Sequence, residues 1–285
     1  MKRLVLALTA IAAFTVPALA ADLRAKAPPM RAAPVAYAPS WTGFWISGGF
    51  GYGLAQYQHS EYNLAAPLGN GLLVSTGQDA GGKGWLGKVG IGYDYQFAGP
   101  YGNWVVGVFA DADWSNISGQ YSFNSTGVPG ALIAASNLTG SFRNDYSWAV
   151  GGRIGYVALP GLLTYFNGGY TQAHFEGSTF FNTNAPAAPL LTSISLGSHT
   201  RDGWFLGGGT EYAVSQLPGL FWKNEVRFSD YGNRTHTLTC SAPAAGCGLG
   251  AGGSVATQTS RVYEQKATTE LVYRFNWGGP VVAKY

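Results

Sequence analysis

The chain has 285 residues, of which 11% are charged and 14% are aromatic, and its formal net charge is +3 at pH 7. This charged fraction is less than half of what a soluble globular domain usually carries. Basic residues barely exceed acidic ones, which excludes a nucleic-acid-binding protein, since such proteins concentrate positive charge. A chain poor in charge and rich in Trp and Tyr favours a protein whose outer surface meets lipid.

Residues 1–20 have the parts of a secretory signal peptide: a basic start, an apolar run over 4–16 and an Ala-Leu-Ala cleavage site at 18–20. The apolar run is shorter than the roughly 20 residues of a membrane-spanning helix, so we expect export and cleavage rather than anchoring. Residues 21–40 are rich in Ala and Pro and predict an extended periplasmic linker. The folded domain is therefore expected over 41–285.

Segments of strand length follow the linker, each with apolar and polar residues in alternation. We predict eight strands, at 42–58, 84–98, 103–119, 141–158, 162–176, 201–215, 220–231 and 261–277. The register of the fifth segment cannot be read from the sequence, because Tyr165 and Phe166 are adjacent.

The connections between these segments alternate between short and long. The short ones are 99–102, 159–161 and 217–219; the long ones are 59–83, 120–140, 177–200 and 232–260. Two of the short connections carry Pro followed by Gly, which is typical of a type II turn. The pattern predicts an all-β fold: an eight-stranded antiparallel transmembrane β-barrel with short periplasmic turns and long extracellular loops.

One face of each segment is bulky and apolar, and the other carries charges among Gly, Ser and Ala. In the third segment, for example, Val106 and Val108 alternate with Gly107, whereas Asp111 and Asp113 share the phase of Gly107. The interior of an eight-stranded barrel is just wide enough to be filled by side chains. We therefore place the bulky face in lipid and the charged face in the lumen.

The charges predicted to line the lumen nearly balance. They are Lys88, Asp94, Asp111, Asp113, Arg143, Asp145, Arg153, Glu211, Lys223, Glu225, Arg227, Glu264, Lys266, Glu270 and Arg274. Because buried charges persist only when they are paired and hydrogen-bonded, we interpret them as a salt-bridge network that plugs the lumen. A narrow polar pore is the alternative. The acids form a scattered, neutralised set without a catalytic pair, which predicts no enzyme activity.

Aromatic residues near the strand ends predict the two girdles that mark the membrane interfaces. Their Trp members are Trp45, Trp85, Trp104, Trp114, Trp204, Trp222 and Trp277. The other aromatics assigned to these rings are Phe97, Tyr156, Tyr165 and Tyr212 near the short turns, and Tyr57, Phe142 and Tyr231 near the long loops.

The last long loop holds the only two cysteines, Cys240 and Cys247, for which we predict a disulfide because the exported chain folds in an oxidising compartment. The four histidines lie in or near the loops, where solvated side chains are the common outcome. We predict no metal site and no cofactor.

The stretches 21–23 (Ala-Asp-Leu) and 40–46 (Ser-Trp-Thr-Gly-Phe-Trp-Ile), together with the ending 273–285, resemble the small porin-family outer-membrane β-barrel proteins of alphaproteobacteria. The resemblance implies an eight-stranded barrel of the opacity-protein and OmpA-like kind in the outer membrane. It also implies roles in envelope integrity, surface exposure and sometimes solute passage, and it transfers no catalytic residue.

We therefore expect a non-enzymatic integral outer-membrane barrel with a structural, surface-exposed role in the envelope. A small-bore diffusion porin is the alternative, and a soluble periplasmic lipocalin-like binder is a weaker one. The expected partners are outer-membrane lipid and the barrel assembly machinery, which reads a terminal aromatic such as Phe275 or Tyr285. We expect a monomer and no nucleic acid partner, and the sequence does not identify extracellular partners of the loops.

Overall fold

The structure is a computed structural model of the whole chain. It describes residues 39–63, 72–76, 79–124, 137–183, 190–241 and 254–275. The predicted signal peptide, nearly all of the predicted linker, Trp277, Cys247 and Tyr285 lie outside the described residues. Within the described ranges, no helix is long and apolar enough to cross a membrane.

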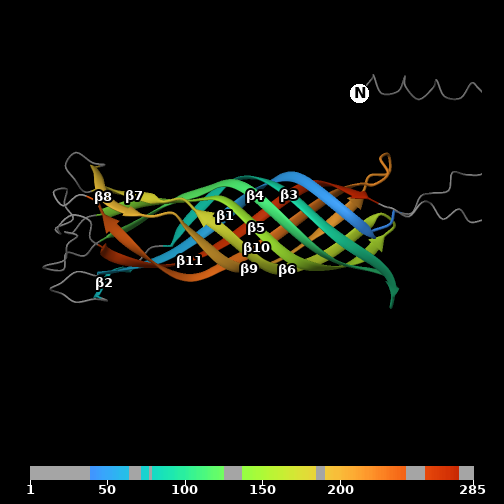
Figure 1. Ribbon diagram of the computed structural model, residues 1–285, viewed down its shortest axis with the longest axis horizontal. Helices are drawn as coiled ribbons and strands as arrows, with labels where there is room; N and C mark the ends of the chain where they lie inside the picture. The colour runs from blue at the N-terminus through green and yellow to red at the C-terminus, as the bar shows by residue number, and fades with distance from the viewer. Residues whose placement is uncertain are drawn as a thin grey trace, which may run out of the picture. The chain divides into compact units, whose positions relative to one another are not determined.

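All regular structure in the described ranges is β-strand. The strands are β1 (Gly43–Asn63), β2 (Leu72–Thr76), β3 (Ala80–Gly99), β4 (Gly102–Asn124), β5 (Asn137–Leu159), β6 (Leu162–Phe175), β7 (Ser178–Asn182), β8 (Leu190–Leu196), β9 (His199–Ala213), β10 (Leu220–Cys240) and β11 (Ser254–Phe275). Eight of them form an antiparallel ring in the order β1, β3, β4, β5, β6, β9, β10 and β11, and β11 pairs back to β1 (Figure 1). The predicted fold class is confirmed.

Tight turns join the strands at one end of the barrel, which we call the turn end. Gly161 and Gly219, each directly after a proline, have φ angles of 89° and 86°. This left-handed backbone is what a type II turn requires after its proline and what glycine adopts without strain. The opposite end, which carries β2, β7 and β8, is called the loop end.

The strands extend further toward the loop end than the sequence predicts. β4 continues to Asn124 and β10 to Cys240, inside segments expected to be loops. β7 pairs with β5 and β8 pairs with β10, so this hairpin continues the sheet beyond the ends of β6 and β9 (Figure 1). Residues 235–239 (Thr-His-Thr-Leu-Thr) explain the difference, because alternating threonines suit a strand although they give little hydrophobic contrast.

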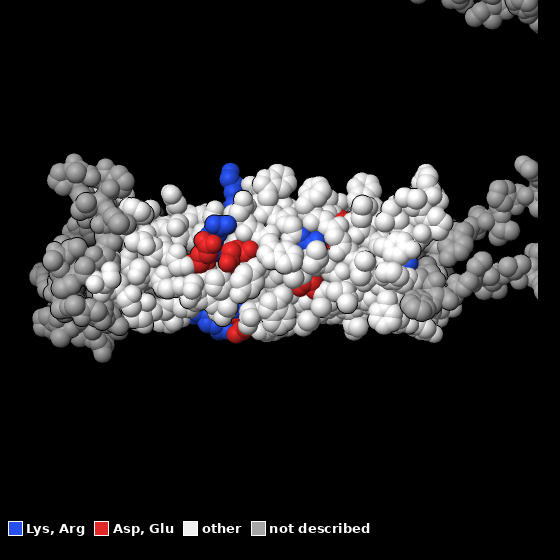
Figure 2. Space-filling view, turned by 45° about the horizontal axis from the view of Figure 1, so that its top comes forward, with Lys and Arg blue, Asp and Glu red and all other residues white. Residues whose placement is uncertain are grey.

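The barrel wall separates an apolar outer face from a polar inner face. Along β3, exposed and buried side chains alternate, with Val89 and Ile91 outside and Lys88 inside. In the strand whose register was unreadable, Tyr165 points inward and Phe166 outward. Most of the surface seen in Figure 2 is uncharged, and the largest group of charged atoms lies toward the loop end. We call the band of exposed apolar residues the lipid-facing belt.

Of the predicted girdle residues, Trp85, Trp114, Trp204 and Trp222 lie exposed on the outer face. Trp104 is half-buried and packs edge-on against Tyr156. The assignment of Trp45 to the girdle is wrong, because Trp45 shares the inward phase of Ser47 on β1 and is only 2% exposed. The same correction applies to a further set of inward, buried aromatics: Tyr57, Phe142, Tyr165 and Tyr231.

Candidate functional site: the lumen charge network

Among the described residues, the lumen contains equal numbers of buried basic and acidic side chains. The basic ones are Lys88, Arg153, Arg201, Lys223, Arg227, Lys266 and Arg274. The acidic ones are Asp94, Asp111, Asp113, Glu211, Glu225, Glu264 and Glu270. All of them except Arg201 were predicted to line the lumen. We refer to the set as the lumen network and describe it in three groups from the turn end upward.

The turn-end group pairs two arginines with two carboxylates. Arg153 donates from Nε to Asp94 at 2.8 Å and from Nη1 to Glu211 at 3.1 Å, and a further bond from Nη2 reaches Asp94. Arg274 donates to the same two acids, at 2.6 Å to Glu211 and 2.5 Å to Asp94. Trp45 lies under the Arg153 guanidinium, 4.9 Å away. Each charge therefore meets two opposite charges, which is the condition for burying ions.

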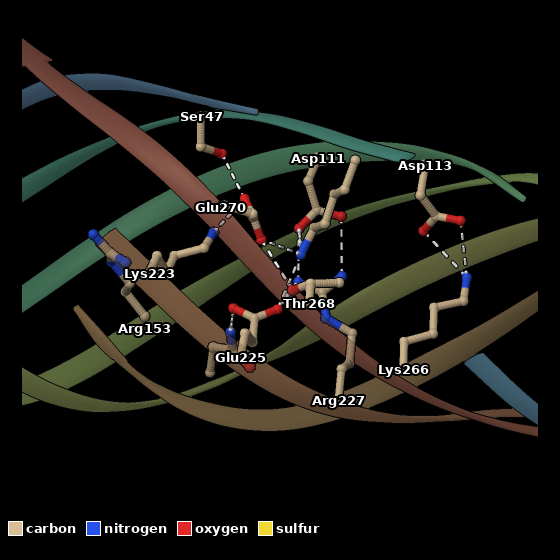
Figure 3. Close-up of polar contacts among 12 residues, drawn as sticks. Ser47, Asp111, Asp113, Arg153, Lys223, Glu225, Arg227, Lys266, Thr268 and Glu270 are labelled. Atoms are coloured by element: carbon tan, nitrogen blue, oxygen red, sulfur yellow. Dashed lines mark hydrogen bonds and ion pairs between the residues drawn. The ribbon is translucent and has the colours of Figure 1, made fainter. Parts of the chain in front are cut away.

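The central group bridges strands on opposite sides of the lumen (Figure 3). Lys88 on β3 reaches Asp111 at 3.3 Å, Glu225 at 3.0 Å and Glu270 at 3.4 Å. Arg227 on β10 binds Asp111 at 2.6 Å and Glu225 at 2.8 Å. Lys223 completes the group with an ion pair of 2.8 Å to Glu270. Three basic and three acidic side chains thus neutralise one another.

Neutral donors occupy the remaining lone pairs of the central carboxylates. Ser47 donates to Glu270 at 2.7 Å, and Thr268 donates to the same carboxylate at 3.1 Å. Asn167 and Tyr165 both donate to Glu225, at 2.7 Å and 3.0 Å. Each oxygen of Glu225 and of Glu270 thus accepts two contacts, and partners of this kind stabilise buried polar groups.

The loop-end group contains one cation and two carboxylates. Lys266 binds Asp113 at 3.0 Å and Glu264 at 3.2 Å. Asn144 and Tyr231 donate further hydrogen bonds to Glu264, at 2.7 Å and 3.1 Å. This group alone would leave one net negative charge in the lumen.

Arg201 restores the balance of the whole lumen, and sequence reasoning missed it. It is fully buried, donates to the carbonyl and the hydroxyl of Ser260, and lies against the rings of Tyr57 and Phe175. Among the described residues it forms no ion pair. The sequence does indicate that Arg201 points inward, because Arg201 shares its strand phase with Glu211.

Arg143 and Asp145 were predicted to face the lumen, and this is wrong. Arg143 lies on the outer face, 3.5 Å from Glu176, and Asp145 contacts His174 at 2.7 Å. The cause is an irregularity in the pairing of β5 with both neighbours, between Asn144 and Tyr146, that shifts the strand phase. Because one inserted residue exchanges the two faces, Asn144 takes the inward position.

Apolar layers lie in the lumen on both sides of the network. Toward the turn end, Trp41, Trp45, Leu163, Phe221 and Val272 belong to one buried cluster. Toward the loop end, the buried cluster includes Tyr57, Ile117, Tyr121, Phe142, Phe175 and Tyr231. We call these the turn-end layer and the loop-end layer. Strand phase could have revealed some members, since Phe221 is in phase with Lys223 and Phe109 with Asp111.

Three histidines lie at the loop end, beyond the lipid-facing belt. Burial lowers the pKa of His59, His199 and His236 to about 4, so all three are neutral at pH 7. The rings of His199 and His236 are 3.9 Å apart. Within the described residues, no group of three or more His, Cys, Asp or Glu could hold a metal ion.

Cys240 is the last residue of β10 and is disulfide-bonded. Its predicted partner, Cys247, lies outside the described residues. Phe275 is the final residue of β11.

A closed antiparallel ring with an apolar outer belt and a charged interior defines an outer-membrane β-barrel protein. No protein-family model matches the chain. The chain is 30% identical over 234 residues to the 31 kDa outer-membrane immunogenic protein of Brucella melitensis, a match that covers 82% of this chain and 89% of that protein. The protein of the same name from Brucella suis matches equally well. The chain belongs to the family of these outer-membrane proteins.

Solved structures of outer-membrane proteins are also similar, at low identity. OprG from Pseudomonas aeruginosa is 13% identical with a TM-score of 0.45, covering 84% of this chain and 98% of that chain. The outer-membrane protease OmpT from Escherichia coli is 12% identical with a TM-score of 0.46, covering 81% and 97%.

Membership of the Brucella family confirms the predicted outer-membrane location and the resemblance noted from the two ends of the chain. The soluble periplasmic lipocalin-like alternative is therefore wrong.

Proposed function

We propose that the protein is a non-enzymatic structural barrel of the outer membrane, closed to solutes, whose loop end faces the surroundings. The observation that carries the proposal is the lumen network, in which opposite charges from facing strands are bonded to one another across the barrel. Breaking such a buried pair leaves an uncompensated charge. The network therefore supports a rigid plug.

The occupied lone pairs of the described lumen carboxylates support a non-enzymatic role. A general base or nucleophile needs an unoccupied lone pair within reach of a substrate. Glu225 and Glu270, the best-connected carboxylates, accept bonds from Lys88 and from neutral donors at the same time. Both are buried, with the loop-end and turn-end layers above and below the network.

The diffusion porin is the second candidate, motivated by the glycines of the inward faces. Two of those glycines, Gly92 and Gly151, lie against aromatic rings. A Cβ added at Gly92 would meet the ring of Trp45 at 2.5 Å, and one at Gly151 would meet Phe205 at 2.8 Å. Since such distances are shorter than real Cβ contacts, these two glycines make space for packed aromatics, which supports a filled lumen.

The experiment is a deletion strain assayed for leakage of a periplasmic enzyme, for detergent sensitivity and for uptake of a small sugar. We expect leakage and sensitivity to rise, sugar uptake to stay unchanged, and the wild-type gene to restore the envelope. An intact envelope with slowed sugar uptake would contradict the proposal and support the porin.

A further inference from the structure

Among the described residues, Arg201 on β9 is the one buried cation of the lumen that no carboxylate contacts. The other six, among them Lys266 and Arg274, each form an ion pair. Arg201 donates from Nη1 to the Ser260 carbonyl at 3.0 Å and from Nη2 to the Ser260 hydroxyl at 2.6 Å, whereas no described residue bonds its Nε. Because a buried charge without an opposite charge is costly, this position favours an anion beside the guanidinium.

Neither the loop-end group nor the loop sequences supply a carboxylate for Arg201. Glu264 of the loop-end group already accepts bonds from Lys266, Asn144 and Tyr231. The loop stretches outside the described residues contain neither Asp nor Glu; they are 64–71, 77–78, 125–136, 184–189 and 242–253. A counter-ion in contact with Arg201 therefore has to come from outside the protein.

Two histidine rings stand beside Arg201 at the loop-end mouth of the lumen. His199 is one inward position nearer the loop end on the same strand, and His236 faces it from β10 with the ring centroids 3.9 Å apart. His199 Nδ1 donates to the Gly197 carbonyl at 3.1 Å, so its Nε2 carries the lone pair of the neutral ring. The Nε2 atoms of both rings are buried, and no described residue bonds them. Three nitrogens without a described partner, including Arg201 Nε, therefore lie at this mouth.

We propose that Arg201, His199 and His236 form a binding site for a free tetrahedral oxyanion, sulfate or phosphate, which enters from the loop end; we call it the mouth site. Oxyanion oxygens accept charge-assisted bonds from a guanidinium, and only two of its five N–H donors are used within the described chain. The rings of Tyr57 and Phe175, 5.8 Å and 5.6 Å from the guanidinium carbon, shield it from water and so strengthen such bonds. Because the mouth site lies on the loop-end side of the lumen network, its occupation does not require an open barrel.

An anion fits these residues better than a metal ion does. Neutral ring nitrogens are common metal ligands, but a divalent cation would lie next to the charge of Arg201. Within the described residues, no third His, Cys, Asp or Glu completes a metal-binding group with the two rings. Burial first, and then the charge of Arg201, lower the pKa of His236. The same electrostatic coupling disfavours a bound cation and favours a bound anion.

Oxyanion binding at the mouth site is coupled to proton uptake. His199 Nε2 becomes a donor only when its ring is protonated, and a bound anion stabilises the protonated rings. The affinity should therefore rise as the pH falls from neutral toward about 4, the pKa of both rings without the anion.

The surrounding groups leave this coupling to the anion. Two carboxylates on neighbouring strands are already bonded, Asp145 to His174 at 2.7 Å and Glu264 to Lys266 at 3.2 Å. The other titratable or charged groups around the site are Tyr57, His59, Asp79, Tyr121, Tyr231 and Arg234.

Isothermal titration calorimetry of the detergent-folded full chain with sulfate tests the proposal, at about pH 5 and about pH 7.5 and at an ionic strength held constant with chloride. Heat-modifiable mobility verifies that every variant is folded. We expect the wild type to bind sulfate at least tenfold more tightly at the lower pH, with net proton uptake. Arg201→Gln should lose sulfate binding, and His236→Gln should lose most of the gain at low pH. His174→Gln, which removes a histidine of the outer face, is the matched control and should bind as the wild type does.

Sulfate binding that is absent from the folded wild type, equal at the two pH values, or unchanged in Arg201→Gln would overturn the proposal. If Arg201→Gln does not fold, the comparison of His236→Gln with His174→Gln decides, and equal pH dependence of these two variants would overturn it. Binding of Zn²⁺ in place of sulfate would assign the rings to a metal ion. Tighter binding of glycerol phosphate than of inorganic phosphate would assign the site to a phosphate ester, such as a lipid headgroup, and overturn the choice of a free anion.

Discussion

The two halves of the lumen are held together by different kinds of interaction. From the turn end to the middle of the barrel, charges from opposite strands bind one another, and Arg153 and Arg274 share the carboxylates of Asp94 and Glu211. At the loop end, Tyr57 stacks on Phe142 with ring centroids 5.1 Å apart and packs beside Tyr121. The first half depends on partners of fixed geometry, whereas the second depends on filled volume. The comparison teaches that each half should fail in its own way.

The largest effect is expected from Glu211→Gln, which keeps the volume and removes the charge shared by two buried arginines. We expect a loss of about 4 kcal/mol in the free energy of unfolding, within the range for breaking a buried ion pair. Urea titration of the folded barrel in detergent measures it.

Glu176→Gln is the control for that variant, because Glu176 pairs with Arg143 on the exposed outer face. Exposed ion pairs of this kind contribute about 0–1 kcal/mol to the free energy of unfolding. Equal effects of the two substitutions would contradict the importance assigned to the network.

Phe175→Ala should produce the next largest effect. Phe175 is 2% exposed and packs edge-on against Tyr231 in the loop-end layer. We expect a loss of about 3 kcal/mol, the low end for truncating a buried aromatic. Hydrogen exchange should rise in the loop-end halves of β6 and β9 and stay unchanged beside Glu211. A uniform rise along the barrel would mean that the two halves are not independent.

Ser47→Ala should cost about 1 kcal/mol, as expected for one hydrogen bond among several. Glu270 loses the donor at 2.7 Å but keeps Thr268 and both lysines. The urea midpoint should move slightly at constant slope. A loss as large as that of Glu211→Gln would show that the network tolerates no missing donor.

At neutral pH the smallest effect is that of the histidines, because it is absent there and develops only as the pH falls. Burial lowers the pKa of His199 and His236 from 6.5 to about 4, so the unfolded chain binds protons first as the pH falls. Stability should therefore be full above pH 6.5 and decrease between about 6.5 and 4. The double variant His199→Phe and His236→Phe should flatten this decrease in thermal unfolding scans. If the double variant keeps the pH profile of the wild type, the loss of stability at low pH does not come from His199 and His236.

The sequence predicted the ring because turn chemistry and strand period agree in most segments. The Pro-Gly turns indicate that neighbouring strands run antiparallel, and the regular alternation of β3 indicates which of its side chains face inward. The phase of Asn144 could not be predicted, because the irregularity in β5 follows from pairing with both neighbours.

The lumen was harder to predict than the wall. The assignment of aromatics near the strand ends to the girdles misplaced Trp45, although its phase with Ser47 points inward. The assignment fails because inward glycines such as Gly92 make room for a large ring. Arg201 was missed because it is the first residue of the predicted segment 201–215, where its phase with Glu211 was the one sign that it points inward.

Planar-bilayer conductance of the folded wild-type protein tests most directly whether the lumen is closed, beside a variant in which Glu225→Gln and Arg227→Gln neutralise two bonded partners of the central group. Folding of both proteins is verified by heat-modifiable mobility. The account predicts no steady conductance from the wild type. Reproducible steps from the wild type, altered in the variant, would contradict it and identify an open pore lined by these charges.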